Sequence, residues 1–251
     1  MMLPMQNVRS IREYFIYALE RSEFVQDKTG VKTIEVVGAQ FLADEPAIFG
    51  TVNEEYIKNE LLWYKSMSRY VDDIPGGPPK IWRQVCSTTG LINSNYGWCI
   101  WHEDNWNQYK CCLKQLQDDK NSRRAIMIYT RPSMQMEYNV NGMSDFMCTN
   151  AVQYLIRDGE LYALVNMRSN DVWAGYRNDK AWQDYVHQSL ASDLGVEVGP
   201  MIWQAGSLHC YERDFWRVEC HSKYGRDMTR SEYEALTSRE QSLTHIEERP
   251  R

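Results

Sequence analysis

Two alternating apolar runs, at residues 152–156 and 161–165, are separated only by the turn Arg157-Asp158-Gly159-Glu160. A period of two residues predicts strands, and a tight turn between them predicts a β-hairpin. Three further segments have strand character: 33–37, 125–129 and 201–203. Gly38, directly after the first of these, indicates a bend or a bulge. The chain is therefore expected to contain a β-sheet.

Two longer segments have apolar residues at helical spacing, which predicts helices. The first covers residues 53–70, with Asn53 as its N-cap ahead of two glutamates, and the second runs from residue 179 to about 194. Residues 74–79 hold two Gly and three Pro, which predict a loop. Strands and helices in one chain are compatible with a mixed α/β fold, but this pattern alone does not identify it.

Composition and charge limit the class of protein. No internal repeat or Gly/Ser linker divides the 251 residues, so one domain is expected over 1–251, with a charged surface helix and tail from about 225. The net charge of −6 argues against a general nucleic-acid-binding protein. No run approaches the roughly 20 apolar residues of a membrane helix, and the first residues lack a signal-peptide pattern, which favours the cytoplasm. Seven cysteines without CxxC or metal-ligand spacing favour reduced thiols and no metal site.

Cys148 lies just before a predicted strand, in a region whose cationic residues are arginines. A thiol becomes a competent nucleophile when a neighbouring positive charge lowers its pKa. One interpretation is therefore an arginine-activated thiolate. The other is a small core residue, since free cysteine is among the most buried residue types.

The run Arg168-Ser169-Asn170-Asp171, followed by Gly175 and Asp179, resembles a motif of the thymidylate synthase family. Other short runs occur in the order found in that family: Lys28-Thr29-Gly30, Glu60-Leu61-Leu62-Trp63-Tyr64, Ile81-Trp82, Asn95-Tyr96-Gly97-Trp98, Asn121-Ser122-Arg123-Arg124 and Ser207-Leu208-His209-Cys210-Tyr211. Most members have Asn at the position of Asp179. An aspartate there is similar to the deoxycytidylate hydroxymethylase branch.

The resemblance implies a large, bent mixed β-sheet flanked by helices, and a homodimer packed sheet to sheet. For this branch it implies that dCMP, 5,10-methylenetetrahydrofolate and water give 5-hydroxymethyl-dCMP and tetrahydrofolate. No metal takes part in that reaction. The branch belongs to bacteriophages, so the implied setting is the cytoplasm of an infected bacterium, with a dNTP-synthesis complex as a candidate partner.

In the implied mechanism Cys148 attacks C6 of the pyrimidine and forms a covalent adduct. Arg168 holds the thiolate and the nucleotide phosphate, although a surface ion pair would also explain an arginine there. The other implied phosphate ligands are Ser169, Lys28 and, from the second subunit, Arg123 and Arg124. Lysine at position 28 keeps the charge of the usual arginine but loses its bidentate fork.

The resemblance implies that Asp179 recognises the pyrimidine base. A carboxylate can accept from the N4 amino group of cytosine while sharing a proton with N3. Uracil presents O4 and N3–H instead, which an ionised carboxylate matches poorly. The alternative is that Asp179 is an ordinary N-cap of the helix that follows.

Other residues have implied roles beside plainer ones. Glu60 is expected to move protons at the exocyclic group and at the C5 methylene, or else to be a solvated helix residue. His209 and Tyr211 are expected to hold the 3′-hydroxyl of deoxyribose, or else to be core residues. Three residues are expected near the folate, two of which core packing would also explain: Asp171, Trp82 and Tyr96.

The chain departs from thymidylate synthases at Thr149 and Asn150, after the cysteine, and has no apolar C-terminal tail. A more open site suits capture of the methylene intermediate by water. The alternatives are a thymidylate synthase, a deoxyuridylate hydroxymethylase, or a non-catalytic nucleotide-binding scaffold subunit.

Overall fold

The computed structural model describes residues 6–27 and 30–247. The helices are α1 Val8–Glu20, α2 Glu54–Ser66, α3 Lys80–Val85, α4 Tyr96–Trp101, α5 Gln108–Asp118, α6 Met134–Glu137, α7 Ala174–Leu194, α8 Phe215–Tyr224 and α9 Arg230–Glu247. Short 3-10 helices cover Val71–Asp73, Glu103–Asn105, Val140–Gly142 and Glu212–Asp214. The strands are β1 Val25–Gln26, β2 Lys32–Leu42, β3 Ile126–Ile128, β4 Thr149–Arg157, β5 Glu160–Asp171 and β6 Glu197–Tyr211.

The strands form one sheet in the order β1-β2-β6-β5-β4-β3. Neighbouring strands are antiparallel except β5 and β6, which are parallel and are connected through α7. The predicted hairpin is confirmed, because Arg157 of β4 pairs with Glu160 of β5. The predicted mixed α/β class is confirmed as well.

The sheet changes its buried side at the same level on adjacent strands. On β5 the odd-numbered residues are buried up to Met167, after which Asn170 is buried and Ser169 is not. On β6 the alternation is broken at Gly206, where an added Cβ would come within 2.8 Å of the Arg168 carbonyl oxygen. Gly38 of β2 has a φ of +71°, which only glycine adopts readily. The bend indicated at Gly38 is therefore part of a kink that crosses the sheet.

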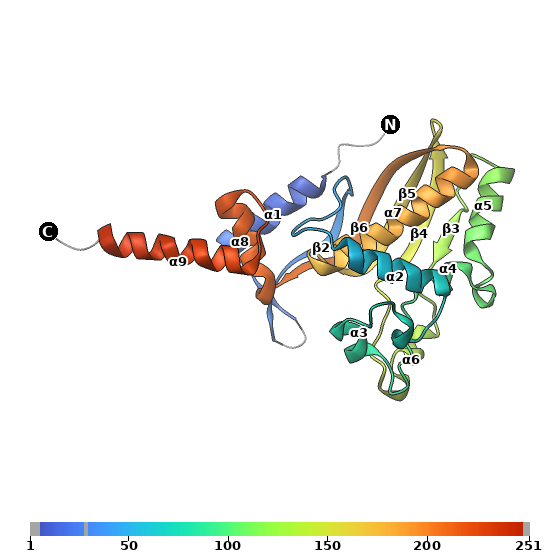
Figure 1. The fold of residues 1–251 in the computed structure, drawn as a ribbon. Helices are drawn as coiled ribbons and strands as arrows, with labels where there is room; N and C mark the ends of the chain where they lie inside the picture. The colour runs from blue at the N-terminus through green and yellow to red at the C-terminus, as the bar shows by residue number, and fades with distance from the viewer. Residues whose placement is uncertain (1–5, 28–29, 248–251) are drawn as a thin grey trace.

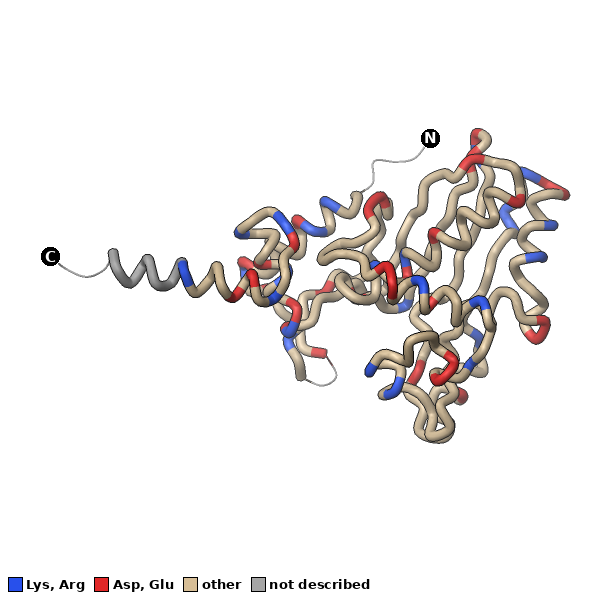
Figure 2. The backbone as a smooth tube through the Cα atoms, viewed as in Figure 1, with Lys and Arg blue, Asp and Glu red and all other residues tan. Residues whose placement is uncertain are grey.

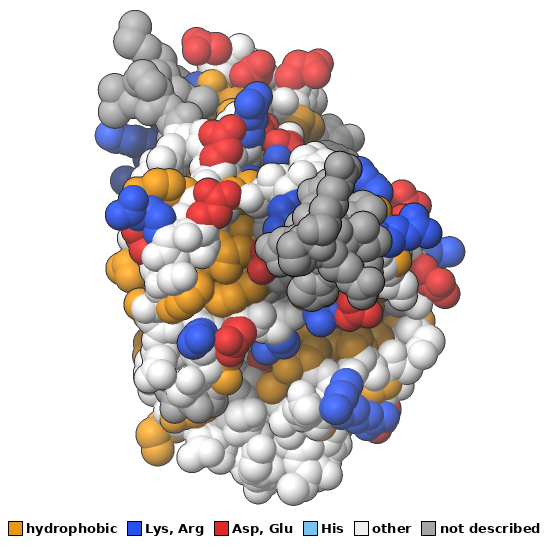
Figure 3. All heavy atoms as spheres, turned by 90° about the vertical axis from the view of Figure 1, so that its left-hand side faces the viewer, with side chains coloured by type: hydrophobic (Ala, Val, Ile, Leu, Met, Phe, Trp, Pro, Cys, Tyr) orange, Lys and Arg blue, Asp and Glu red, His pale blue; other side chains and the backbone are white. Residues whose placement is uncertain are grey.

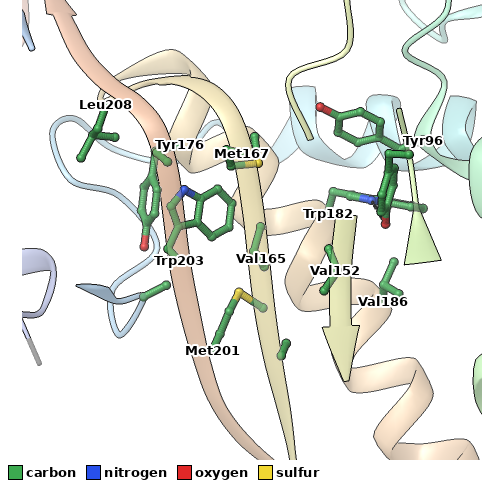
Figure 4. Close-up of a cluster of buried hydrophobic side chains, with 14 of the residues drawn as sticks. Tyr96, Val152, Val165, Met167, Tyr176, Trp182, Val186, Met201, Trp203 and Leu208 are labelled. Carbon is green, nitrogen blue, oxygen red and sulfur yellow. Dashed lines mark hydrogen bonds between the residues drawn. The ribbon is translucent and has the colours of Figure 1, made fainter. Parts of the chain in front are cut away.

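Helix α7 lies across one face of the sheet, and α2 and α5 lie beside it (Figure 1). Helices α1 and α8 pack together at the β1–β2 end, and α9 projects from that end (Figure 1). The core between α7 and the sheet is rich in aromatic residues. Tyr176 and Trp203 contact each other at 5.1 Å at one end, and Tyr96 and Trp182 lie at the other (Figure 4).

The helix predictions need two corrections. Asn53 caps α2 as expected, accepting from the Tyr56 N–H at 3.0 Å, but the helix ends at Ser66 because Met67 takes a left-handed conformation with φ of +56°. Helix α7 begins at Ala174, five residues before the predicted start. The charged C-terminal segment forms α9, as predicted for a surface helix, and the predicted tail at 248–251 is outside the described residues.

Positions of Lys and Arg are interspersed with positions of Asp and Glu along the backbone (Figure 2). Within residues 6–27 and 30–247, no helix combines the length and apolarity needed to span a membrane. The seven cysteines are all free thiols.

Candidate active site

Cys148 stands immediately before β4 and is half-buried at the wall of a cavity of about 330 Å³. The guanidinium of Arg168 on β5 lies 3.8 Å from its Sγ, and the backbone N–H of Arg168 donates to the Cys148 carbonyl at 2.7 Å. Arg168 also stacks on Phe146, at 5.2 Å from the ring centroid. The predicted Cys–Arg pair is therefore present in the fold.

The thiol is nevertheless protonated in the free protein. Burial raises the pKa of Cys148 to about 12, and the negative charge of Asp179 raises it further, while the positive charge of Arg168 lowers it. Arginine alone does not offset burial. Activation of the thiol thus requires a change in its surroundings, such as the arrival of a ligand.

Asp179 faces the same cavity from the second turn of α7, so it is not the helix N-cap. One carboxylate oxygen accepts from the Tyr96 hydroxyl at 3.2 Å and the other from the Asn170 amide at 2.8 Å. Burial, and then the charge of Glu60, raise the pKa of Asp179 to about 7. The N-terminus of α7 is capped instead by Asp171, whose Oδ1 accepts from the Trp173 and Ala174 N–H groups at 2.7 and 2.8 Å.

Glu60 is a second buried carboxylate in this cavity, with 5% of its surface exposed. Burial raises the pKa of Glu60 to about 7, and the neighbouring groups of Tyr56, Tyr64 and Trp82 lower it. The Tyr56 hydroxyl donates to it at 2.5 Å. The structure thus places Glu60 inside the protein, and the interpretation as a solvated helix residue is wrong.

The two aromatic residues expected near the folate line the cavity as well. Trp82 on α3 lies 5.8 Å from Trp63, and Tyr96 at the start of α4 stacks on Tyr64 at 5.3 Å. Together with Glu60, they bring residues from three separate helices to one space. The cavity therefore contains a thiol, two carboxyl groups that ionise near neutral pH, and aromatic walls.

The other predicted nucleotide ligands lie in a neighbouring pocket of about 270 Å³ on the sheet. Ser169, His209 and Tyr211 line it, and the His209 and Tyr211 rings meet edge to face at 4.8 Å. Burial lowers the pKa of His209, so its imidazole is neutral at pH 7. Glu35 also lines this pocket and accepts from the Ser207 hydroxyl.

The two arginines predicted to bind phosphate from the second subunit line neither cavity. Arg123 and Arg124 are exposed just before the edge strand β3, and their guanidinium groups have no ion-pair or hydrogen-bond partner among the described residues. Lys28 lies outside the described residues.

Two residues that donate hydrogen bonds to the carboxylates of the cavity were missed by the sequence analysis. Asn170 is 3% exposed and donates to Asp179, and Tyr56 donates to Glu60. Asn170 lies inside the motif run and Tyr56 lies four residues before Glu60, one turn away on the same helix. These two positions are the sequence features from which the roles of Asn170 and Tyr56 could have been predicted.

No cluster of three or more His, Cys, Asp or Glu side chains in the described part of the chain is arranged to hold a metal ion. The side chains of the cavity can supply nucleophilic attack by sulfur and proton transfer by two carboxyl groups.

Residues 13–246 match the family model described as thymidylate synthase. The deoxycytidylate 5-hydroxymethyltransferase of Enterobacteria phage T4 is 59% identical over 225 residues, which are 87% of this chain and 92% of the relative. That of phage T2 is 60% identical over 219 residues, 84% and 89% of the two chains. A thymidylate synthase of Francisella tularensis subsp. holarctica is 22% identical over 226 residues, 84% and 82% of the two chains. The family match over residues 13–246, together with relatives about 60% identical over most of the chain, shows that this protein belongs to the thymidylate synthase family.

Proposed function

We propose that this protein is a deoxycytidylate 5-hydroxymethyltransferase: dCMP, 5,10-methylenetetrahydrofolate and water give 5-hydroxymethyl-dCMP and tetrahydrofolate. The relatives of phages T4 and T2 carry that name. The observation that carries the choice of base is the carboxyl group of Asp179, held in the cavity of Cys148 with a pKa of about 7.

A single shared proton explains why this carboxyl group selects cytosine. When N3 of cytosine takes the proton of Asp179, the resulting carboxylate faces two donors, N3–H and N4–H. Uracil offers N3–H and the acceptor O4, so one carboxylate oxygen then faces a lone pair. A proton at N3 also draws electrons from the ring and makes C6 more electrophilic.

The proton shared by Asp179 and N3 of cytosine also affects the ionisation of the nucleophile, Cys148. The negative charge of Asp179 is the second cause, after burial, of the raised pKa of Cys148. When a cationic N3–H offsets that charge, the thiolate becomes easier to form, and Arg168 at 3.8 Å stabilises it. Sulfur then bonds to C6, and C5 gains the electron density needed to attack a one-carbon unit.

The folate supplies that one-carbon unit at the oxidation level of formaldehyde. Trp82 and Tyr96 give the cavity an aromatic wall that suits a flat pterin ring. Glu60, with a pKa of about 7, can hold or release a proton at the C5 side and orient the water that ends as the hydroxyl group. Asp171 uses Oδ1 to cap α7, which leaves Oδ2 for a pterin N–H.

The phosphate site supports a homodimer as the functional unit. Ser169 lines the nucleotide pocket and Arg168 precedes it on β5, whereas the guanidinium groups of Arg123 and Arg124 are exposed at the edge of the sheet and have no partner among the described residues. Ile126 and Ile128, next to them on β3, are 42% and 50% exposed. A second copy packed on this face would cover the apolar residues and bring the arginines to a phosphate. The setting is the cytoplasm of a phage-infected bacterium, and a dNTP-synthesis complex remains a candidate partner.

The test is a mass spectrum of the nucleotide after incubation with methylenetetrahydrofolate and either dCMP or dUMP, with dihydrofolate absorbance followed in parallel. The proposal expects a hydroxymethyl group on dCMP and no dihydrofolate. Methylation of dUMP with dihydrofolate would instead identify a thymidylate synthase. Binding of dCMP without exchange of its C5 proton would favour a scaffold subunit.

A further inference from the structure

Tyr56 is a polar residue of the active-site cavity that the mechanism above does not use. It lies in the first turn of α2, where the side chain of Asn53 accepts from its backbone N–H at 3.0 Å. Its hydroxyl donates to Oε1 of Glu60, one turn further along the helix, at 2.5 Å. The helix cap and this hydrogen bond hold the two ends of the residue, so its hydroxyl has a fixed place in the cavity.

Tyr56 is more accessible to solvent than the carboxyl group behind it. Tyr56 is half-buried, whereas only 5% of the surface of Glu60 is exposed. Ile81 lines the same cavity and is 56% exposed, so the cavity is open to water on that side. A hydroxyl that donates one hydrogen bond keeps two lone pairs for accepting others. A water that enters the cavity can therefore donate to Tyr56 while Tyr56 donates to Glu60.

The indole N–H of Trp82 is a second polar group at this place. Its Nε1 is buried and has no hydrogen-bond partner among the described residues. Trp82 lowers the pKa of both Tyr56 and Glu60, which indicates that its N–H lies near both oxygens. A buried donor without an acceptor is costly, and a bound water would supply the acceptor. Trp82, Tyr56 and Glu60 together give such a water the two to four polar partners that ordered buried waters have.

The hydroxyl of Tyr56 keeps its proton at neutral pH. Burial, and then the negative charge of Glu60, raise the pKa of Tyr56 above the usual value of a tyrosine. The pKa of Glu60 is about 7, so its carboxyl group can gain or lose a proton at neutral pH. The hydroxyl can consequently pass a proton to Glu60 only if it takes up another at the same time. A donor to Tyr56 is therefore required for transfer.

The face of the molecule shown in Figure 3 carries charges of both signs. Lys and Arg side chains lie among Asp and Glu side chains on this face, from which α9 projects (Figure 3). A surface of mixed charge has no strong field of one sign to attract or repel a charged nucleophile. The selection of water as the nucleophile therefore depends on groups inside the cavity.

We propose that Tyr56 relays a proton from the attacking water to Glu60. This rests on the proposed function, in which water captures an exocyclic methylene group at C5 while sulfur is bonded to C6. The water oxygen bonds to the methylene carbon, the electrons of the exocyclic double bond form the C5–C6 double bond, and the C6–S bond breaks to release the thiolate of Cys148. The proton lost by the water goes to the Tyr56 hydroxyl, and the hydroxyl proton goes to Oε1 of Glu60.

A thiolate can attack the same methylene carbon without this relay. Water must lose a proton as it adds, whereas a thiolate has no proton to lose. Loss of the Tyr56 hydroxyl should therefore slow capture by water and leave capture by a small thiol unchanged. The C5 hydrogen of dCMP leaves before either capture, so tritium at C5 reports the earlier step separately.

The test is Tyr56→Phe, which keeps the ring and removes the hydroxyl. With C5-tritiated dCMP and methylenetetrahydrofolate, kcat for 5-hydroxymethyl-dCMP should fall about 10- to 100-fold, with the KM for dCMP within about twofold. The first turnover of the variant should release about one tritium per active site before product forms. With 2-mercaptoethanol present, mass spectrometry should find the C5 thioether of dCMP as the main product of the variant, and 5-hydroxymethyl-dCMP as that of the wild type.

Tyr109→Phe is the matched control. The Tyr109 hydroxyl also donates to a carboxylate, that of Asp193 at 2.8 Å, but neither residue lines the active-site cavity or the nucleotide pocket. The control loses the same kind of hydrogen bond as Tyr56→Phe. Its kcat and its ratio of thioether to hydroxymethyl product should match those of the wild type.

Two results would overturn the proposal. One is an unchanged kcat in Tyr56→Phe. The other is an equal slowing of tritium release and of product formation without thioether, which would limit Tyr56 to a structural role beside Glu60. Failure of the wild-type protein to form 5-hydroxymethyl-dCMP would refute the proposed function instead.

Discussion

Asp179→Asn is expected to stabilise the free protein while it impairs the use of dCMP. The pKa of this carboxyl group is raised from 3.8 to about 7, mainly by burial. Below about pH 4 it is protonated in both the folded and the unfolded states, and it does not affect the free energy of unfolding. As the pH rises to 7, the unfolded chain ionises first, so stability falls, and above pH 7 the folded state bears the full cost.

The size of this effect follows from the pKa shift. A shift of about 3 units corresponds to about 4 kcal/mol, since one unit is 1.36 kcal/mol. Asp179 is partly exposed to its cavity, and solvent there reduces the value to about 2 kcal/mol. Asparagine keeps the shape and does not ionise. The free energy of unfolding of the variant, relative to wild type, should therefore increase by about 2 kcal/mol between pH 4 and pH 8.

Urea unfolding of both proteins at pH 4.5, 6 and 8, at one fixed protein concentration, measures this difference. Glu60 is present in both proteins, so its own titration largely cancels. The reasoning fails if the stability difference is the same at all three pH values. In parallel, kcat/KM for dCMP should fall about 10- to 150-fold as one charge-assisted hydrogen bond is lost, and the ratio of dUMP to dCMP use should rise.

Three other substitutions test the remaining parts of the active site. Cys148→Ser should lower kcat by about 1,000-fold or more and abolish the covalent adduct in a denaturing mass spectrum, while dCMP still binds; a retained adduct would exclude Cys148 as the nucleophile. Glu60→Gln should lower kcat by about 100-fold or more with little change in the KM for dCMP, which steady-state kinetics measures. An unchanged kcat would exclude proton transfer by Glu60. Asn170→Ala should lower kcat/KM for dCMP about tenfold and shift the pH–rate profile, because Asp179 loses the donor at 2.8 Å; a normal profile would limit Asn170 to packing.

The sequence predicted the parts of this fold that depend on local pattern. Three features could be predicted because each depends on residues close together in the chain: the hairpin around Gly159, the N-cap at Asn53 and the Pro/Gly loop at 74–79. The start of α7 was missed. Its cap comes from Asp171, three residues upstream of the first helical residue, and the intervening Val172-Trp173 does not resemble a helix start.

The site was predicted through family resemblance and not through spacing. Glu60, Cys148 and Asp179 are separated by about 90 and 30 residues, and only the packing of α7 against the sheet and of α2 against α7 brings them to one cavity. Periodicity placed Glu60 on a helix but could not say that its face was buried. The raised pKa of Cys148 could not be predicted from the sequence either, because it depends on the burial of the thiol and on the nearby charge of Asp179, and both are set by the tertiary fold.

The kink in the sheet explains how one short motif serves two binding pockets. Consecutive residues of a strand point to opposite sides. Ser169 therefore faces the nucleotide pocket, while Asn170 points to the core side and holds Asp179. Without the switch after Met167, the buried positions would stay odd-numbered, and Ser169 would take the core position now held by Asn170. Gly206 permits the switch, since the Cβ of a side chain there would lie 2.8 Å from the Arg168 carbonyl oxygen.

Gly206→Ala should consequently weaken both phosphate binding and base selection, although residue 206 touches neither pocket. Separate measurement of the KM for dCMP and of the ratio of dCMP to dUMP use would reveal this. A loss of only one of the two would show that the pockets are positioned independently of the kink.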